Sequence, residues 1–144
     1  MSITTPTKII TKVKSGAKME GIVGYSRIVA IDDLIFISNT AGRNPETGEM
    51  PDTFKEQVEH AMATLKRSLE SVGAKFEDIV SYRAYAPDPQ DLKDGAELLG
   101  SYFRGIDPCC TVTCSPLAAP YYKFEIEATA YRGASDATVE IVNI

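Results

Sequence analysis

Charged side chains alternate with apolar ones near the end of the chain, over residues 122–130. This alternation predicts a strand with one buried face, because successive side chains of a strand point to opposite sides. The polar face carries Lys123, Glu125 and Glu127. Three charges in a row on one strand face require water, a partner subunit or a ligand to meet them. A carboxylate in such a place can act as a general base that takes a proton from an attacking water molecule.

The cysteines and the single histidine do not have the spacing of a metal site. At the rise of a strand, Cys110 and Cys114 on one face lie roughly 13 Å apart, too far to hold one ion. His60 is expected on the polar side of a helix. We therefore predict no metal and interpret the cysteines as small, buried apolar side chains. The alternative is Cys110 as a thiol nucleophile or redox-sensitive group, although no neighbouring histidine is visible to activate it.

Composition limits the class of protein. A chain of 144 residues predicts one domain over 1–144. The net charge of −5 disfavours a nucleic-acid partner. No apolar run approaches the roughly 18 residues of a membrane helix, and residues 1–14 lack the apolar core of a secretory signal. Three cysteines, an odd number, do not form a disulfide framework, which predicts a reducing, cytoplasmic location.

The predicted helices and strands that position these residues are interspersed along the chain, as in a mixed α/β protein. Thr53 and Glu56 form a capping box that opens a helix ending at Gly73. A second helix is predicted over residues 91–103, and a polar loop over 38–48. Strands are predicted at residues 8–13, 25–31, 34–38, 79–86, 110–115 and 122–131, with a short extra one at 138–142. Helices separated by single strands predict one mixed sheet with two helices packed on one face.

Five segments, in order and spacing, resemble the RidA/YjgF/UK114 family, also labelled endoribonuclease L-PSP. They are Gly24-Tyr25 and residues 34–38, 44–51, 72–80 and 124–128. The resemblance spans residues 24–132 and implies an α+β, chorismate-mutase-like protomer that assembles as a homotrimer. It further implies small-molecule pockets between subunits, hydrolysis of reactive enamines and imines such as 2-aminoacrylate, and no metal or organic cofactor.

The resemblance assigns several pocket positions. Tyr25 matches the family's pocket tyrosine, and Ser38 matches the serine whose backbone lies beside the substrate. Glu127 matches the acid that positions water. Asn39 stands where a glycine is usual, and Ala96 stands where deaminating members have an asparagine.

One departure changes the expected chemistry. Deaminating members carry an arginine that binds the substrate carboxylate through two parallel hydrogen bonds, and that position is Cys110 here. Losing a charge-assisted contact of about 1.5–3 kcal/mol lowers affinity roughly ten- to a hundredfold. Arg83, mid-strand, is the preferred substitute. The other candidates are Arg27, Arg43 and Arg104.

These residues predict a protein that binds a small enamine- or imine-type metabolite at an inter-subunit cleft. If it hydrolyses that metabolite, Glu127 is the catalytic residue, and Tyr25, Ser38, Asn39, Arg83 and Cys110 contact the substrate. Classical 2-aminoacrylate deamination is not expected. Two alternatives stay open: a non-catalytic binding or chaperone-like trimer, and an endoribonuclease. The acidic charge and the lack of a basic, aromatic strip oppose the endoribonuclease.

Overall fold

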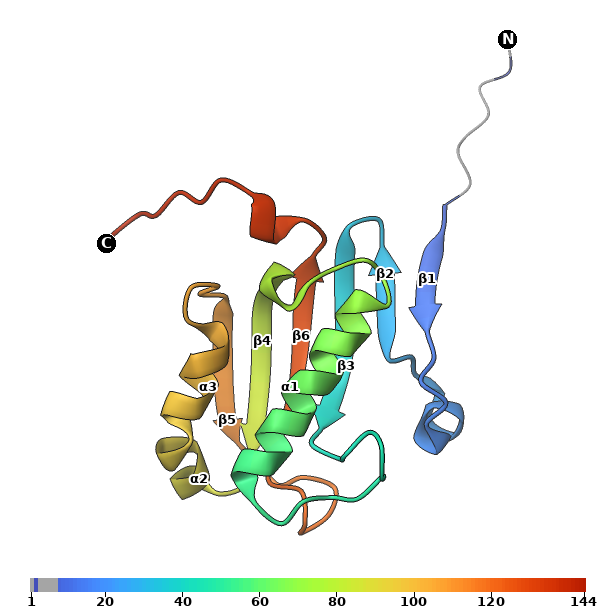
Figure 1. The fold of residues 1–144 in the computed structure, drawn as a ribbon. Helices are drawn as coiled ribbons and strands as arrows, with labels where there is room; N and C mark the ends of the chain where they lie inside the picture. The colour runs from blue at the N-terminus through green and yellow to red at the C-terminus, as the bar shows by residue number, and fades with distance from the viewer. Residues whose placement is uncertain (1, 3–7) are drawn as a thin grey trace.

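The computed structural model describes residue 2 and residues 8–144, so part of the N-terminal stretch considered for a signal lies outside the described residues. Six strands form one sheet in the order β1-β2-β3-β6-β4-β5 (Figure 1). All neighbouring strands are antiparallel except β4 and β5, which are parallel. The strands are β1 (Ile10–Val13), β2 (Ile28–Ile31), β3 (Leu34–Ala41), β4 (Ile79–Ala86), β5 (Cys109–Cys114) and β6 (Glu125–Tyr131).

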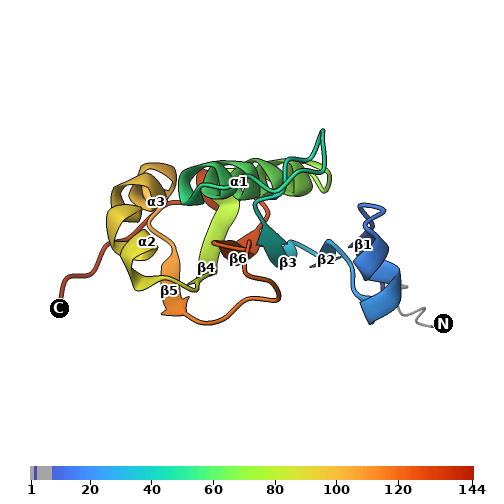
Figure 2. The same ribbon diagram turned by 90° about the horizontal axis from the view of Figure 1, so that it is seen from below.

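The helices lie on one side of this sheet. They are α1 (Phe54–Glu70), α2 (Pro89–Asp94) and α3 (Ala96–Phe103), with short helical turns η1 (Glu20–Gly24), η2 (Phe76–Asp78) and η3 (Ala134–Asp136). Seen from below, α1, α2 and α3 cover one face, and the short turn η1 lies apart from them, at the β1 edge of the sheet (Figure 2). The predicted α+β class, with helices on one face of a mixed sheet, is confirmed.

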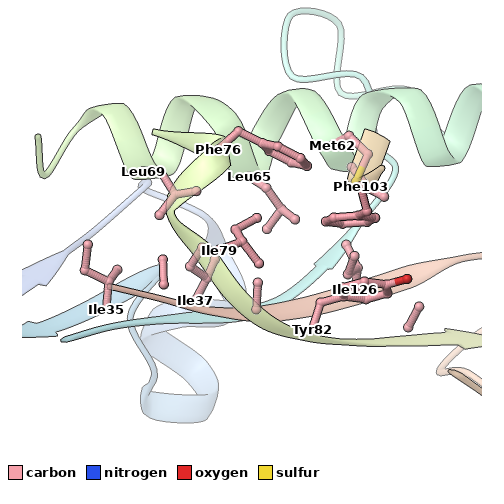
Figure 3. Packing of buried hydrophobic residues seen from close by; sticks show 14 of the residues in the cluster. Ile35, Ile37, Met62, Leu65, Leu69, Phe76, Ile79, Tyr82, Phe103 and Ile126 are labelled. Carbon is pink, nitrogen blue, oxygen red and sulfur yellow. The ribbon is translucent and has the colours of Figure 1, made fainter. Parts of the chain in front are cut away.

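The core fills the space between α1, α3 and the covered face. Met62, Leu65 and Leu69 of α1 point toward the isoleucines of the sheet (Figure 3). The Tyr82 ring of β4 stacks on Phe103 of α3, with ring centroids 4.1 Å apart. This packing holds α1 and α3 against the sheet. The opposite sheet face is therefore the one available for ligands or partners.

The ends of α1 agree with the capping signals. The Thr53 hydroxyl accepts a hydrogen bond from the Glu56 backbone N–H at 3.2 Å and donates to the Glu56 carboxylate at 2.9 Å. This reciprocal pair satisfies groups that the first turn leaves free. Past the last turn, the N–H of Gly73 bonds to the Glu70 carbonyl.

The predicted helix over residues 91–103 is two helices. It begins earlier, at Pro89, and breaks at Gly95. A Cβ at Gly95 would lie 2.3 Å from the Phe54 ring of α1, so only glycine fits here. The junction between α2 and α3 is therefore the position where these two helices contact the start of α1.

Several strand boundaries also differ from the prediction. The strands expected from residues 25 and 122 begin at Ile28 and Glu125, because residues 25–27 and 122–124 have irregular backbone. The strand expected to end at Ser38 continues to Ala41, so the polar loop starts later. No strand forms over residues 138–142, which lie exposed beyond η3.

Candidate functional site

Glu127 lies in the middle of the uncovered sheet face. In β6 the side chains of Ile126 and Ala128 are buried under the helices, so Glu127 points to the other side. Its cross-strand neighbour in β4 is Arg83, and Tyr85 follows two residues later on the same face. The pairing of β4 with β6 thus brings together a carboxylate, a guanidinium and a phenol.

Of these three residues, Arg83 and Glu127 border a small hollow of about 230 Å³. Its floor is formed by β3, β4 and β6. Its lining includes Arg83 and Glu127 with Phe36, Ser81 and Thr129. The mixture of one aromatic ring, two hydroxyls and two opposite charges suits a small polar molecule.

Tyr85 fixes the orientation of the carboxylate. Its hydroxyl donates to Oε1 of Glu127 at 2.5 Å. Accepting from this hydroxyl, the carboxylate raises the pKa of Tyr85, and burial acts in the same direction, so the phenol keeps its proton. The second carboxylate oxygen has no hydrogen-bond donor among the described residues.

A β-bulge in β3 faces Glu127. Ile37 pairs with Ala128 and Thr40 with Ile126, so two residues, Ser38 and Asn39, stand opposite Glu127. The Asn39 amide donates to Oε2 of Glu125 at 2.5 Å. Burial raises the pKa of Glu125, and the Asn39 bond opposes that shift. The bulge therefore places both predicted residues beside the acidic row of β6.

The Ser38 side chain has a structural partner. Its hydroxyl donates to the Ser26 carbonyl at 2.6 Å, which ties β3 to the segment before β2. Tyr25 lies at the end of η1, where its carbonyl accepts from Lys14 Nζ at 2.7 Å. Tyr25 does not line the hollow beside Glu127. Within one protomer, then, this tyrosine is not brought to the acid.

Cys110 lies on the other side of the sheet from Glu127. It is paired in the parallel ladder with Tyr82, whose ring is under α3, whereas Glu127 is paired with Arg83. All three cysteines are exposed, so the interpretation of them as buried apolar side chains is wrong for the protomer. The reason is that β5 is the edge strand of the sheet.

The arginines proposed as substitutes lie in different places. Arg83 alone lines the hollow with Glu127. Arg104 is paired on the surface with Glu97 at 2.7 Å. Arg27 and Arg43 line a separate hollow.

Tyr85 was not predicted as a site residue. The sequence does contain a signal for it, since Ser81, Arg83 and Tyr85 occupy every second position of a predicted strand and therefore share one face. The sequence does not reveal the strand register that brings this row next to Glu127.

Residue 2 and residues 8–144 contain neither a cluster of metal ligands nor a membrane-spanning helix. In that part of the chain no three His, Cys, Asp or Glu side chains gather as a metal site would need. Nor does any described helix combine the length and apolarity needed to cross a bilayer.

The mixed sheet with a polar site on its uncovered face defines a known class of small α+β proteins. Residues 15–132 match the family model described as endoribonuclease L-PSP. The chain belongs to this family, which also carries the names RidA, YjgF and UK114.

Curated relatives include enzymes. The chain is 30% identical to a mouse 2-iminobutanoate/2-iminopropanoate deaminase over 129 residues, covering 88% of this chain and 96% of the relative. It is 37% identical to a RutC family protein of Aquifex aeolicus over 82 residues, covering 57% of this chain and 66% of that protein.

Among solved structures, a YjgF/YER057c/UK114 family member from Mycobacterium tuberculosis superimposes with a TM-score of 0.77. It is 31% identical to this chain, and the match covers 85% of this chain and 99% of that one. Yeast Mmf1, at 14% identity, has a TM-score of 0.74 over 86% of this chain and 99% of its own, which supports the fold alone.

Proposed function

We propose that this protein hydrolyses a small imine or enamine at a cleft between protomers, with Glu127 as the general base. The observation that carries the proposal is the Glu127 carboxylate, fixed by Tyr85 and set opposite Arg83 on the sheet face that no helix covers. Relatives named 2-iminobutanoate/2-iminopropanoate deaminase support the class of reaction.

The chemistry needs a placed water, an acceptor for its proton and a proton for the nitrogen. Water attacks the carbon of the C=N bond while one of its protons passes to Glu127, and the protonated Glu127 gives that proton to the nitrogen. The carbinolamine then transfers its hydroxyl proton through Glu127 to the nitrogen as the C–N bond breaks, which releases ammonia and leaves a carbonyl product. Tyr85, which keeps its proton, holds one carboxylate oxygen and leaves the other to face water.

The placement of Cys110 supports a cleft between protomers, if Cys110 lines the pocket as the resemblance implies. Cys110 and Glu127 are on opposite faces of one sheet, so both can line one pocket only when different protomers contribute them. Exposed apolar side chains on the Glu127 face, Ile31, Leu34, Phe36 and Tyr131, support the burial of this face in a homotrimer.

The substrate differs from 2-aminoacrylate in this proposal. Cys110 replaces the arginine that holds a carboxylate in deaminating members. A neutral imine therefore fits the pocket, and Arg83 is the residue available for an anionic group. The cytoplasmic location remains a prediction from the cysteine pattern.

The test is an ammonia-release assay on freshly generated imines, both neutral and carboxylate-bearing. We expect the wild type to act on neutral imines, Glu127→Gln to be at least a hundredfold slower, and Cys110→Arg to gain activity on 2-aminoacrylate. Arg104→Gln, a change at a surface arginine, serves as the control that leaves activity unchanged. Wild-type protein silent on every imine would instead favour binding without catalysis. RNA cleavage by the pure protein that is lost in Glu127→Gln would favour the endoribonuclease.

A further inference from the structure

A second hollow lies at the end of β3, away from the Glu127 site. It is bordered by β3, α1, the turn over residues 43–48 and the segment before η1, and has a volume of about 450 Å³. It shares no lining residue with the hollow beside Glu127. Its size falls in the range of small-molecule sites, about 300–1,000 Å³.

Three arginines line this hollow: Arg27 before β2, Arg43 in the turn and Arg67 in α1. No aspartate or glutamate is among its lining residues. Within the described part of the chain, none of these arginines forms a salt bridge. Such a concentration of positive charge is unusual in a protein with a net charge of −5.

The neighbouring acid is already satisfied by other groups. Glu20 accepts hydrogen bonds from the Ser15 hydroxyl at 2.5 Å and from the Ser15 backbone N–H at 3.1 Å. Those contacts, the side-chain bond first, hold the pKa of Glu20 below its usual value. The carboxylate therefore stays charged but is directed to Ser15 and not to an arginine.

Two of the arginines are held in place by the fold. Arg27 Nη1 donates to the Thr40 hydroxyl at 2.5 Å and to the Ser38 carbonyl at 3.3 Å. Its Nε is buried and has no acceptor among the described residues, which is a cost unless another group satisfies it. Arg43 donates to the Gly48 carbonyl at 2.8 Å. Each arginine keeps further N–H donors for a ligand, because a guanidinium carries five.

A close approach of backbones sets the position of Arg43. A Cβ at Gly42 would lie 2.0 Å from the Gln57 carbonyl oxygen, so glycine alone lets the turn lie against α1 here. The turn and the helix that carries Arg67 are therefore fixed next to each other.

We propose that this arginine hollow binds a small multivalent oxyanion, the phosphate or carboxylate groups of a metabolite. Guanidinium groups bind phosphate and carboxylate oxygens through paired hydrogen bonds. Three of them around one hollow attract an anion that carries more than one negative charge. The ligand supplies the negative charge that the lining lacks. The site is separate from the imine chemistry proposed above.

Isothermal titration calorimetry at low ionic strength tests the proposal, with inorganic phosphate, pyrophosphate and citrate as probes. We expect one saturable site per chain, weakened as salt is added. Arg43→Ala and Arg67→Ala, both at exposed side chains, should each lower affinity at least tenfold. Arg104→Ala, an exposed arginine outside the hollow, is the matched control and should bind as the wild type does.

The probes separate two sources of the anion. Tighter binding of pyrophosphate assigns a phosphorylated ligand, and tighter binding of citrate assigns a polycarboxylate; either supports the site. No saturable binding of any probe would overturn the proposal, as would an equal loss of affinity in Arg104→Ala. Glu127→Gln should bind the anion unchanged, so a failure of the catalytic proposal is distinguishable from a failure of this one.

Discussion

The two carboxylate oxygens of Glu127 have different surroundings. Tyr85 donates to Oε1, whereas Oε2 has no donor among the described residues, and Glu127 lines the hollow. A general base needs this arrangement, since one oxygen must be fixed and the other free to take a proton. Arg83 opposite adds a positive charge on the same face, which suits a substrate or an intermediate with negative charge.

Removing the Tyr85 hydroxyl tests this orientation. We expect Tyr85→Phe to lower kcat for imine hydrolysis roughly ten- to a hundredfold and to leave KM nearly unchanged, because a hydrogen bond to a charged group is worth about 1.5–3 kcal/mol. Steady-state ammonia release measures both constants. Tyr121→Phe, at an exposed tyrosine, is the control. Equal activity of Tyr85→Phe and wild type would remove Tyr85 from the site.

Among the elements, η2 and η3 are joined by one buried carboxylate. Asp78 is 2% exposed. Its Oδ1 accepts from the Ser135 N–H at 2.8 Å and its Oδ2 from the Lys75 N–H at 2.9 Å. Burial acts to raise the pKa of Asp78, but these donors outweigh it and hold the pKa below its usual 3.8. Asp78 thereby holds the start of β4 in place.

This carboxylate gives a prediction with a defined pH dependence. Asp78→Asn should lower the free energy of unfolding by about 1–3 kcal/mol at pH 7, because an amide leaves one buried N–H unsatisfied. A lowered pKa stabilises the fold above pH 3.8, and this stabilisation is lost as pH falls through the lower folded value.

Urea unfolding, followed by circular dichroism from pH 7 to pH 3, measures the free energy of unfolding of the variant and of the wild type. The difference between these two free energies should become smaller below pH 3.8. Asp136→Asn, at the exposed end of η3, is the control that should match the wild type at each pH. A difference that stays constant with pH would contradict the assignment.

How well each element could be predicted depends on its local signal. The strand over residues 79–86 and the start of α1 were predicted correctly, because β-branched and aromatic residues and a capping box mark them. The break at Gly95 was not, since it depends on the distant Phe54 ring. The bulge at Ser38 and Asn39 was missed as well, because it depends on pairing with β6.

The site shows the same limit. Glu127 and Arg83 could be selected from alternation and resemblance, and the structure sets them side by side. Tyr85 and the opposite placement of Cys110 follow from strand register, which the sequence does not reveal.

For the whole molecule, the uncovered face predicts assembly. Phe36 is 44% exposed in the protomer and lines the hollow beside Glu127. If this face is buried in a trimer, Phe36→Asp places a charge in an apolar contact and should yield monomers by analytical ultracentrifugation. Val142→Asp, at an apolar residue that is 75% exposed beyond η3, should assemble as the wild type does. A Phe36→Asp protein that sediments as the wild type would argue against this face as the interface.

The most direct test of a Glu127 site shared between protomers is activity in mixed assemblies. Glu127→Gln and Cys110→Trp would each be inactive alone, since one lacks the base and the other fills the pocket. After the two are unfolded together and reassembled at equal amounts, the account predicts recovery of about a quarter of wild-type ammonia release. This fraction arises because about one interface in four of a cyclic trimer joins an intact Glu127 to an intact Cys110. No recovery from mixed trimers of normal size would contradict the account.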